Sequence, residues 1–348
     1  MMKENHFFSV LIMTIMYVGV VHSQNIPTNL LLSDLETVEN QYNAGDIQST
    51  QTVNSGTIIY RASNAIVLKP GFHAKAGSNF RAAIDDFSNC INIMTYNIHK
   101  QDYYENGKVI KTSGADVVAV QEISRYPLSG NFNRLKEQAG MEGEFVRTMH
   151  MVVGRYGIAL LWKSSLGTPN VTYKRIESSS ADTDSHRAYI VAEFTDFCLV
   201  STHYSLAPSD QIEMTNSILN HSVVKACQSA GKPVYIAGDL NPKDKDSYPS
   251  SVTPIDLFAS SGFEVLNYTD RIANHGYYIR HHATSEEGGL LDLILGHNQN
   301  PNHEIFWRGV PECLWASDLP NGYTGGEYKD WRFVISDHLP YLIKVKLK

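Results

Sequence analysis

The sequence predicts an α/β fold with packed β-sheets over most of its length, preceded by a small β-rich segment. Short apolar runs typical of strands recur from residue 91 to the end, among them INIMTYNI, DVVAVQEI, CLVSTHY and LLDLILG. Several are apolar almost throughout, as in strands covered on both faces, and helical stretches around residues 131–139 and 209–230 lie between them. The composition, 43% hydrophobic and 19% charged, is that of a globular chain with room for one large and one small domain.

The first element along the chain is an apolar segment at its N-terminus. Lys3 precedes an apolar run over residues 7–21, which is shorter than the ~20 residues that span a membrane. Residues suited to a signal peptidase follow it, ending at Ser23. We expect residues 1–23 to be a cleaved export signal, which would place the protein in the periplasm, on the outer surface or outside the cell. An uncleaved membrane anchor is the alternative. No later run predicts a transmembrane segment.

Residues 24–89 form the second element and are rich in Asn, Ser, Thr, Ala and Gly. Turn signals such as Pro70–Gly71 and Ala76–Gly77 separate short β-type runs, which indicates short strands stacked on one another. The run LKPGFHAKAGSNFRAAI resembles the three-coathanger stack, a small module of secreted proteins in Bacteroidetes-type bacteria. The resemblance implies an exported bacterial protein and an accessory role for this module. A β-rich linker is the alternative.

Charge and cysteine content limit the functions that the chain can have. The net charge of −7 excludes a global basic field, so a polyanionic substrate requires a local basic groove or a bound cation. The four cysteines are scattered and lack the spacing of a zinc site or of a disulfide framework, and their pairing stays open. They are Cys90, Cys198, Cys227 and Cys313.

Polar side chains able to bind a metal ion or a phosphate stand at the ends of the apolar runs in residues 90–348. They are Asn97, Glu122, His203, Asp239, Asn241, Asp292, Asp337 and His338. Buried charges are costly unless they are paired or bind a cation, and strand ends are where a rigid scaffold brings such groups together. The pattern predicts one site for metal-assisted phosphate chemistry. Taken singly, each residue has an ordinary structural explanation, such as a turn, a cap or a satisfied core histidine.

The motifs MTYNIH, VQEI, STHYSL, GDLN, LLDLIL and SDHLP together resemble the endonuclease/exonuclease/phosphatase superfamily, which has the deoxyribonuclease-I-like fold. The resemblance covers residues 91–348 in the family's order, and six motifs in order are specific where GDLN or SDHLP alone is not. It implies a four-layer α/β sandwich with two packed β-sheets, dependence on Mg²⁺ (with Mn²⁺ as the alternative) and cleavage of a phosphoester.

The resemblance also implies roles for the metal-binding and proton-transferring residues. Glu122 would be the principal carboxylate ligand, because Mg²⁺ prefers oxygen and uses one or two carboxylates. Asn97 would bind the phosphate or a metal-bound water, and Asp337 would contact the metal or such a water. His338 would act on the water or on the reacting phosphorus group, with its tautomer fixed by Asp292. His203 would donate to a phosphate oxygen or to the leaving group.

Further residues complete the predicted site. Period-two alternation would point Asp239 and Asn241 to the same face, with Asp239 managing a proton or the nucleophile and Asn241 donating to a phosphoryl oxygen. Gly238 would let the backbone approach closely. Arg187, expected just before a strand, is a candidate phosphate contact, with a surface salt bridge as the alternative. His282, ahead of LLDLIL, is a candidate for the substrate groove.

Departures from the family patterns leave the substrate open. The Gly-Asn-Ala of many relatives is Gly157–Ile158–Ala159, and the arginine motifs of inositol-polyphosphate phosphatases and abasic-site endonucleases are missing. The substrate class therefore stays open among nucleic acids, lipid head-group diesters and small phosphoesters. We expect an exported metal-dependent phosphodiesterase or nuclease. A phosphomonoesterase, a sphingomyelinase-like lipid phosphodiesterase and an inactive surface-binding protein are the alternatives. No obligate protein partner is indicated.

Overall fold

The computed structural model describes thirteen ranges of the chain: 29–32, 35–36, 40–54, 57–84, 90–99, 103–124, 130–148, 156–177, 186–266, 291–297, 305–309, 338 and 340–347. The expected export signal and the candidate residues His282 and Asp337 lie outside these ranges. The chain divides into two compact units after Asp86, and each is described by itself. In the described ranges, no helix combines the length and the apolar character that crossing a membrane requires.

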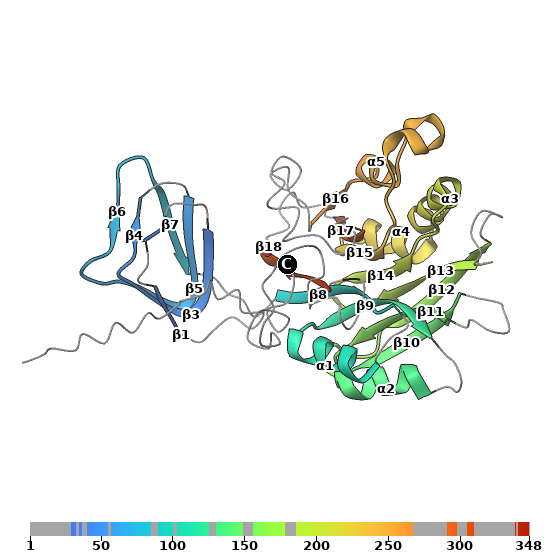
Figure 1. The fold of residues 1–348 in the computed structure, drawn as a ribbon, viewed down its shortest axis with the longest axis horizontal. Coiled ribbons are helices and arrows are strands. Elements are labelled where there is room, and N and C mark those ends of the chain that lie inside the picture. The colour runs from blue at the N-terminus through green and yellow to red at the C-terminus, as the bar shows by residue number, and fades with distance from the viewer. Residues whose placement is uncertain are drawn as a thin grey trace, which may run out of the picture. The chain divides into compact units, whose positions relative to one another are not determined.

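The first unit is a stack of parallel strands. One sheet contains β1 (Asn29–Leu32), β3 (Asn40–Ser49), β5 (Thr57–Leu68) and β7 (Asn79–Ile84), in that order. The other contains β2 (Leu35–Glu36), β4 (Thr52–Val53) and β6 (His73–Ala74). All pairings are parallel, and because the chain alternates between the sheets, successive passes stack on one another (Figure 1). Its small core is Ile47, Val53, Ile58, Tyr60 and Ala62.

The second unit is built on two six-stranded sheets. The first sheet has the order β10-β11-β9-β8-β19-β18, with β8 (Cys90–Asn97), β9 (Val117–Ser124), β10 (Glu142–Arg147), β11 (Tyr156–Trp162), β18 (Ile305–Gly309) and β19 (Tyr341–Lys346). The second has the order β12-β13-β14-β15-β17-β16, with β12 (Asn170–Glu177), β13 (His186–Glu193), β14 (Cys198–His203), β15 (Val234–Asp239), β16 (Phe263–Val265) and β17 (Asp292–His297).

Helices cover the outer faces of both sheets (Figure 1). On the first sheet, α1 (Tyr103–Ser113) packs on α2 (Gly130–Ala139), which contacts β9 and β10. On the second sheet lie α3 (Pro208–Leu219), α4 (Ser222–Ser229) and α5 (Pro254–Ser260). Short 3-10 turns are η1 (Ser164–Leu166), η2 (Lys245–Ser247) and η3 (Pro249–Ser251). The helix expected over residues 209–230 is two helices. The first ends where the Asn220 side chain donates a hydrogen bond to the carbonyl of Asn216, and the backbone of the next residue, His221, is extended.

The two sheets pack face to face, with β8 and β9 opposite β14, β15 and β17. Strand β13 shows why its sequence is apolar throughout. Ala188 and Ile190 belong to the core shared by the two sheets, whereas Tyr189 and Val191 belong to the core beneath the helices. Both faces of the strand are therefore covered, as expected for such runs. The prediction of a four-layer α/β sandwich is confirmed.

Candidate active site

One end of the second sheet carries four of the predicted site residues. Arg187 is in β13, His203 ends β14, Asp239 ends β15 and Asp292 begins β17. Strands β14 and β15 are parallel and β17 is antiparallel to β15, so His203 pairs with Asp239 and Asp239 pairs with Asp292. All four side chains are buried. Strand register alone therefore places two acids and a histidine side by side.

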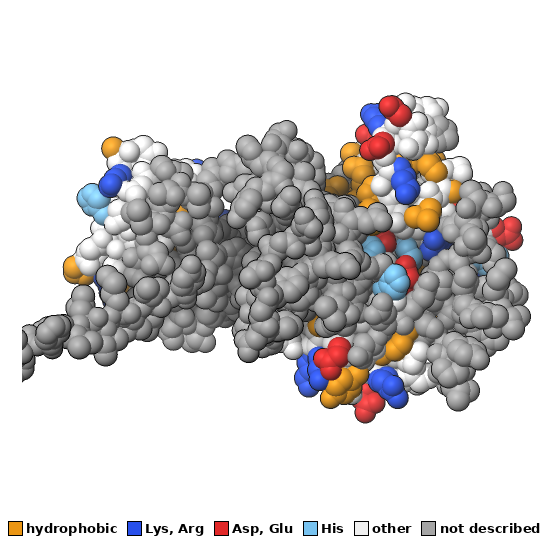
Figure 2. Space-filling view, viewed as in Figure 1, with side chains coloured by type: hydrophobic (Ala, Val, Ile, Leu, Met, Phe, Trp, Pro, Cys, Tyr) orange, Lys and Arg blue, Asp and Glu red, His pale blue; other side chains and the backbone are white. Residues whose placement is uncertain are grey.

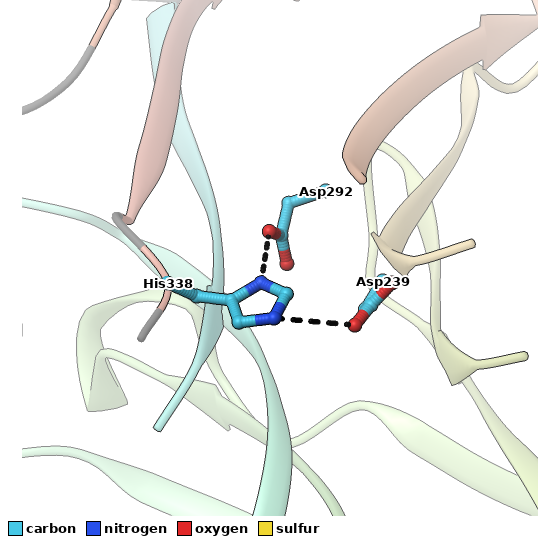
Figure 3. A group of neighbouring side chains, drawn as sticks. All are labelled: Asp239, Asp292 and His338. Atoms are coloured by element: carbon cyan, nitrogen blue, oxygen red, sulfur yellow. Dashed lines mark hydrogen bonds and ion pairs between the residues drawn. The ribbon is translucent and has the colours of Figure 1, made fainter. Parts of the chain in front are cut away.

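His338 completes this group from a position just before β19. Its Nδ1 donates to Asp292 Oδ2 at 2.7 Å, and its Nε2 faces Asp239 Oδ2 at 3.9 Å. Figure 3 shows the imidazole between the two carboxylates, with one ring nitrogen turned to each. The hydrogen bond to Asp292 fixes the ring orientation and puts a proton on Nδ1, which is the arrangement of an acid–histidine pair.

Arg187 lies against His203 and is buried, whereas one of its two sequence alternatives, a surface salt bridge, requires exposure. It sits inside β13 and is 4% exposed, which is at odds with a surface salt bridge. Its Nη1 lies 3.3 Å from His203 Nδ1. Because a guanidinium only donates, Nδ1 is the acceptor and a neutral His203 carries its proton on Nε2. That Nε2 lies 3.6 Å from Asp239 Oδ2, so Arg187 turns the donor of His203 toward the acid.

Asn97, at the end of β8, joins the first sheet to the second. Its Nδ2 donates to Asp239 Oδ2 at 3.1 Å and lies 3.3 Å from Glu122 Oε1. Its Oδ1 accepts from the backbone N–H of His99 at 3.0 Å. A single buried amide therefore links the carboxylate expected to bind metal with the carboxylate at the end of β15.

Glu122 was expected at the end of a strand but lies inside β9, two residues before its end. Opposite it, the pairing with β11 shifts between Gly157 and Ala159, so β9 has two residues against one and forms a bulge. The φ of Glu122 is +57°, a region that non-glycine residues rarely adopt and that is common at functional sites. Unlike the acids of the second sheet it is only partly buried. The bulge thus turns a carboxylate toward solvent.

Asn241 does not continue the strand as alternation requires. Strand β15 ends at Asp239, and Asn241 has a φ of +44°. Its N–H donates to Asp239 Oδ1 at 2.9 Å, and its Nδ2 donates to the Tyr204 carbonyl at 3.1 Å. The period-two argument fails here because it holds only for extended backbone. Gly238 is needed as expected, since a Cβ there would lie 2.1 Å from the Thr202 carbonyl oxygen.

Burial raises the pKa of Asp239 to about 7. The nearby Asp292 carboxylate raises it further, whereas His338 and the hydrogen bonds from Asn241 and Asn97 lower it. Burial and a neighbouring negative charge disfavour the charged carboxylate and raise its pKa, whereas a positive charge and hydrogen-bond donors favour it and lower the pKa. Such a shift in a cluster of polar groups is typical of functional sites.

A divalent cation fits the donor set. Asp239, Asp292 and His338 are the one group of three or more such residues, within the described ranges, whose ligand atoms lie within 4.8 Å of one another. Within this group, Nδ1 of His338 and Oδ2 of Asp292 already form a hydrogen bond with each other at 2.7 Å. The Glu122 carboxylate, beside the Asn97 amide, offers the hard oxygen ligands that Mg²⁺ prefers.

The space-filling view shows histidine, acidic and basic side chains gathered in one area of the larger unit (Figure 2). The structure thus brings together seven predicted residues: Asn97, Glu122, Arg187, His203, Asp239, Asp292 and His338. Asn241 contacts them through its backbone. Sequence reasoning missed Gln211 and Tyr248, which bind the loops beneath the site. A glutamine in a helix and a tyrosine in a turn carry no signal of such contacts.

Residues 94–338 match the model of the Endonuclease/Exonuclease/phosphatase family. The chain belongs to this family. Its members are hydrolases that act on phosphate esters, so the chain is a phosphoesterase at the level of the family. No curated protein matches the sequence.

Solved structures match the chain with low sequence identity. An endonuclease/exonuclease/phosphatase from Beutenbergia cavernae is 17% identical with a TM-score of 0.54, and the match covers 74% of this chain and 72% of that one. The human Nocturnin catalytic domain with bound sulfate is 16% identical with a TM-score of 0.49, covering 75% and 94% of the two chains. A mannosyl-6-phosphatase from Bacteroides thetaiotaomicron is 13% identical with a TM-score of 0.45, covering 73% and 99%.

Proposed function

We propose that the protein is a divalent-metal-dependent phosphodiesterase that hydrolyses nucleic acids or another phosphodiester. The observation that carries the proposal is the contact chain from Glu122 through Asn97 to Asp239 and on to two histidines. It combines oxygen ligands for a cation with groups that can move protons, and both are needed to cleave a phosphate ester near neutral pH.

Glu122, Asn97 and Asp337 would hold Mg²⁺, or Mn²⁺ in its place. The cation would neutralise charge on the phosphate. Glu122 suits this task because it is the partly exposed acid at the bulge, and Asn97 holds its side chain toward the rim. The family membership supports the metal requirement.

The remaining residues would bind the phosphate and manage protons. His338, held by Asp292, keeps Nε2 directed into the site for a water or a phosphoryl oxygen. His203, held by Arg187, presents an Nε2–H that can donate to a second oxygen. Asp239 lies between the two imidazoles and can orient the attacking water or take its proton. Asn241 would act through the backbone of this loop.

A substrate panel tests the proposal. The purified protein is assayed on plasmid DNA, RNA, sphingomyelin, bis-p-nitrophenyl phosphate and p-nitrophenyl phosphate, with Mg²⁺, with Mn²⁺ and with EDTA. The proposal expects cleavage of at least one diester that EDTA abolishes and added Mg²⁺ restores. Preference for the monoester would point to a phosphatase, and preference for sphingomyelin to a lipid phosphodiesterase. Activity on every substrate that EDTA leaves unchanged would refute the metal-dependent reaction.

We also propose that the protein is exported. The apolar run over residues 7–21 and the small residues before position 24 support a cleaved signal. The resemblance of residues 46–90 to a module of secreted proteins supports the same conclusion. Fractionation of producing cells, with N-terminal sequencing of the mature chain, tests this. A cytoplasmic protein that retains its first 23 residues would contradict it.

A further inference from the structure

The loop that follows β15 holds an unfavourable backbone conformation beside the site. Asn241 has a φ of +44° and precedes Pro242. A residue before proline is pushed toward extended backbone, and left-handed backbone at such a residue persists only where the surroundings hold it. Hydrogen bonds from neighbouring residues must therefore hold Asn241 in its left-handed conformation.

Gln211 of α3 holds the backbone of this loop, in addition to the hydrogen bonds that Asn241 itself donates to Asp239 and Tyr204. Its side chain is fully buried, and Nε2 donates to the carbonyl of Asn241 at 2.8 Å and to the carbonyl of Ser205 at 2.7 Å. Ser205 lies two residues after His203, and Asn241 lies two residues after Asp239. One amide therefore ties together the two loops that leave the site from neighbouring strands.

Tyr248 extends the same network to the far end of the loop. Its hydroxyl donates to Gln211 Oε1 at 2.5 Å and accepts from the backbone N–H of Lys243 at 3.0 Å. The carbonyl of Asn241 and the N–H of Lys243, on either side of Pro242, are thus both fixed through Gln211. The nitrogen and the oxygen of the Gln211 side-chain amide thus both take part in this network.

The loop conformation decides how the Asp239 carboxylate is turned. Asp239 Oδ1 accepts the N–H of Asn241 at 2.9 Å, which leaves Oδ2 for Asn97, His203 and His338. If Asn241 relaxed to extended backbone, its N–H would leave Oδ1 and the carboxylate could rotate. The distances between Oδ2 and the two imidazoles would then change.

We propose that Gln211 is a positioning residue for the hydrolysis: it holds Asn241 in its left-handed conformation and so fixes the orientation of Asp239. The inference rests on the proposed function for its effect on rate, but its effect on the loop does not depend on any activity. Gln211 itself touches neither the substrate nor the cation.

The test compares Gln211→Glu with the full-length wild-type protein. The substitution keeps the side-chain length and an acceptor for Tyr248 but removes the two N–H donors. We expect kcat on the best substrate of the panel to fall about 10- to 100-fold with KM changed less than about threefold, since a small displacement of a catalytic group costs this much in rate. Gln138→Glu is the matched control. It makes the same change at a glutamine of α2, on the outer face of the first sheet, and should leave kcat unchanged.

A second readout separates this inference from the proposed function. Amide hydrogen exchange at Asn241 and Lys243 should be at least tenfold faster in Gln211→Glu and unchanged in Gln138→Glu, whether or not any phosphoester is cleaved. If Gln211→Glu does not fold, Tyr248→Phe replaces it with exchange at Asn241 as the readout, because the Lys243 N–H loses its own acceptor in this variant. Unchanged exchange at both amides, or an equal loss of kcat in the control, would overturn the positioning role.

Discussion

The two sheets of the larger unit supply their site residues by different means. In the second sheet, His203, Asp239 and Asp292 are buried neighbours in the strand register. In the first sheet, Glu122 reaches the site through a bulge and is partly exposed. A regular ladder gives a fixed arrangement of proton-handling groups, whereas an irregular strand turns one carboxylate toward solvent. In the proposed function, the groups that handle protons would gather around the end of the second sheet, and Glu122 of the first sheet would bind the cation.

The largest loss of activity is expected from substitution of Asp239, which the strand register places between His203 and Asp292. Asp239→Asn should reduce activity by about 10³-fold or more at any Mg²⁺ concentration, because it removes the group between both imidazoles. Steady-state kinetics with a Mg²⁺ titration measures this. Activity restored by high Mg²⁺ would show that Asp239 acts through cation binding, which would contradict the different roles given to the two sheets.

The same substitution has a pH signature in the metal-free protein. Burial raises the pKa of Asp239 in the folded state to about 7, so the folded state binds the proton more tightly than the unfolded chain. Stability from this group is present at low pH and is lost as the pH rises through about 7. In EDTA, the Tm of wild type should therefore fall relative to that of Asp239→Asn between pH 5 and 8. A constant difference in Tm would contradict the shifted pKa.

Glu122→Gln should give a smaller loss of a different kind. The neutral amide keeps the shape of the bulge but weakens cation binding, so the Mg²⁺ concentration for half-maximal activity should rise about 10- to 100-fold. Activity should recover in part at high Mg²⁺, in contrast to Asp239→Asn. A loss that no Mg²⁺ concentration reduces would place Glu122 in the chemistry instead.

Arg187→Lys should lower kcat about tenfold. A lysine keeps the charge but loses the planar fork that holds the Nδ1 of His203, so the imidazole is less well oriented. Arg175→Lys is the matched control, since Arg175 lies in the adjacent strand β12, beside Ala188, and is exposed. Equal effects of the two substitutions would mean that burial beside His203 gives Arg187 no special role.

The smallest effect is expected at the opposite end of β17, where His297 ends the strand that Asp292 begins. Burial lowers the pKa of His297 from its ordinary value of 6.5. The unfolded chain then binds the proton more tightly, so stability is present above pH 6.5 and is lost as the pH falls below it. His297→Gln should flatten the dependence of Tm on pH between 7 and 5. An unchanged slope would show that this end of the strand does not titrate as its burial predicts.

Most of the site was predictable because strand ends can be located from apolar runs. Asn97, His203, Asp239 and Asp292 lie at the ends of strands, where the sequence placed them. The bulge at Glu122 was not predictable, because it depends on how β11 pairs with β9. The left-handed backbone of Asn241 was not either, since the following proline favours the opposite. Contacts such as Gln211 with Asn241 join residues thirty positions apart and exist only in the folded chain.

The central claim is that Glu122 and its neighbours at the rim of the first sheet bind one divalent cation beside the proton-handling residues, and anomalous diffraction from a crystal soaked in Mn²⁺ tests it most directly. The account predicts a single strong peak within coordination distance, about 2.1 Å, of a Glu122 carboxylate oxygen. The peak should disappear in Glu122→Gln crystals soaked in the same way. An ion bound elsewhere on the molecule, or no ion at a concentration that supports hydrolysis, would contradict the account.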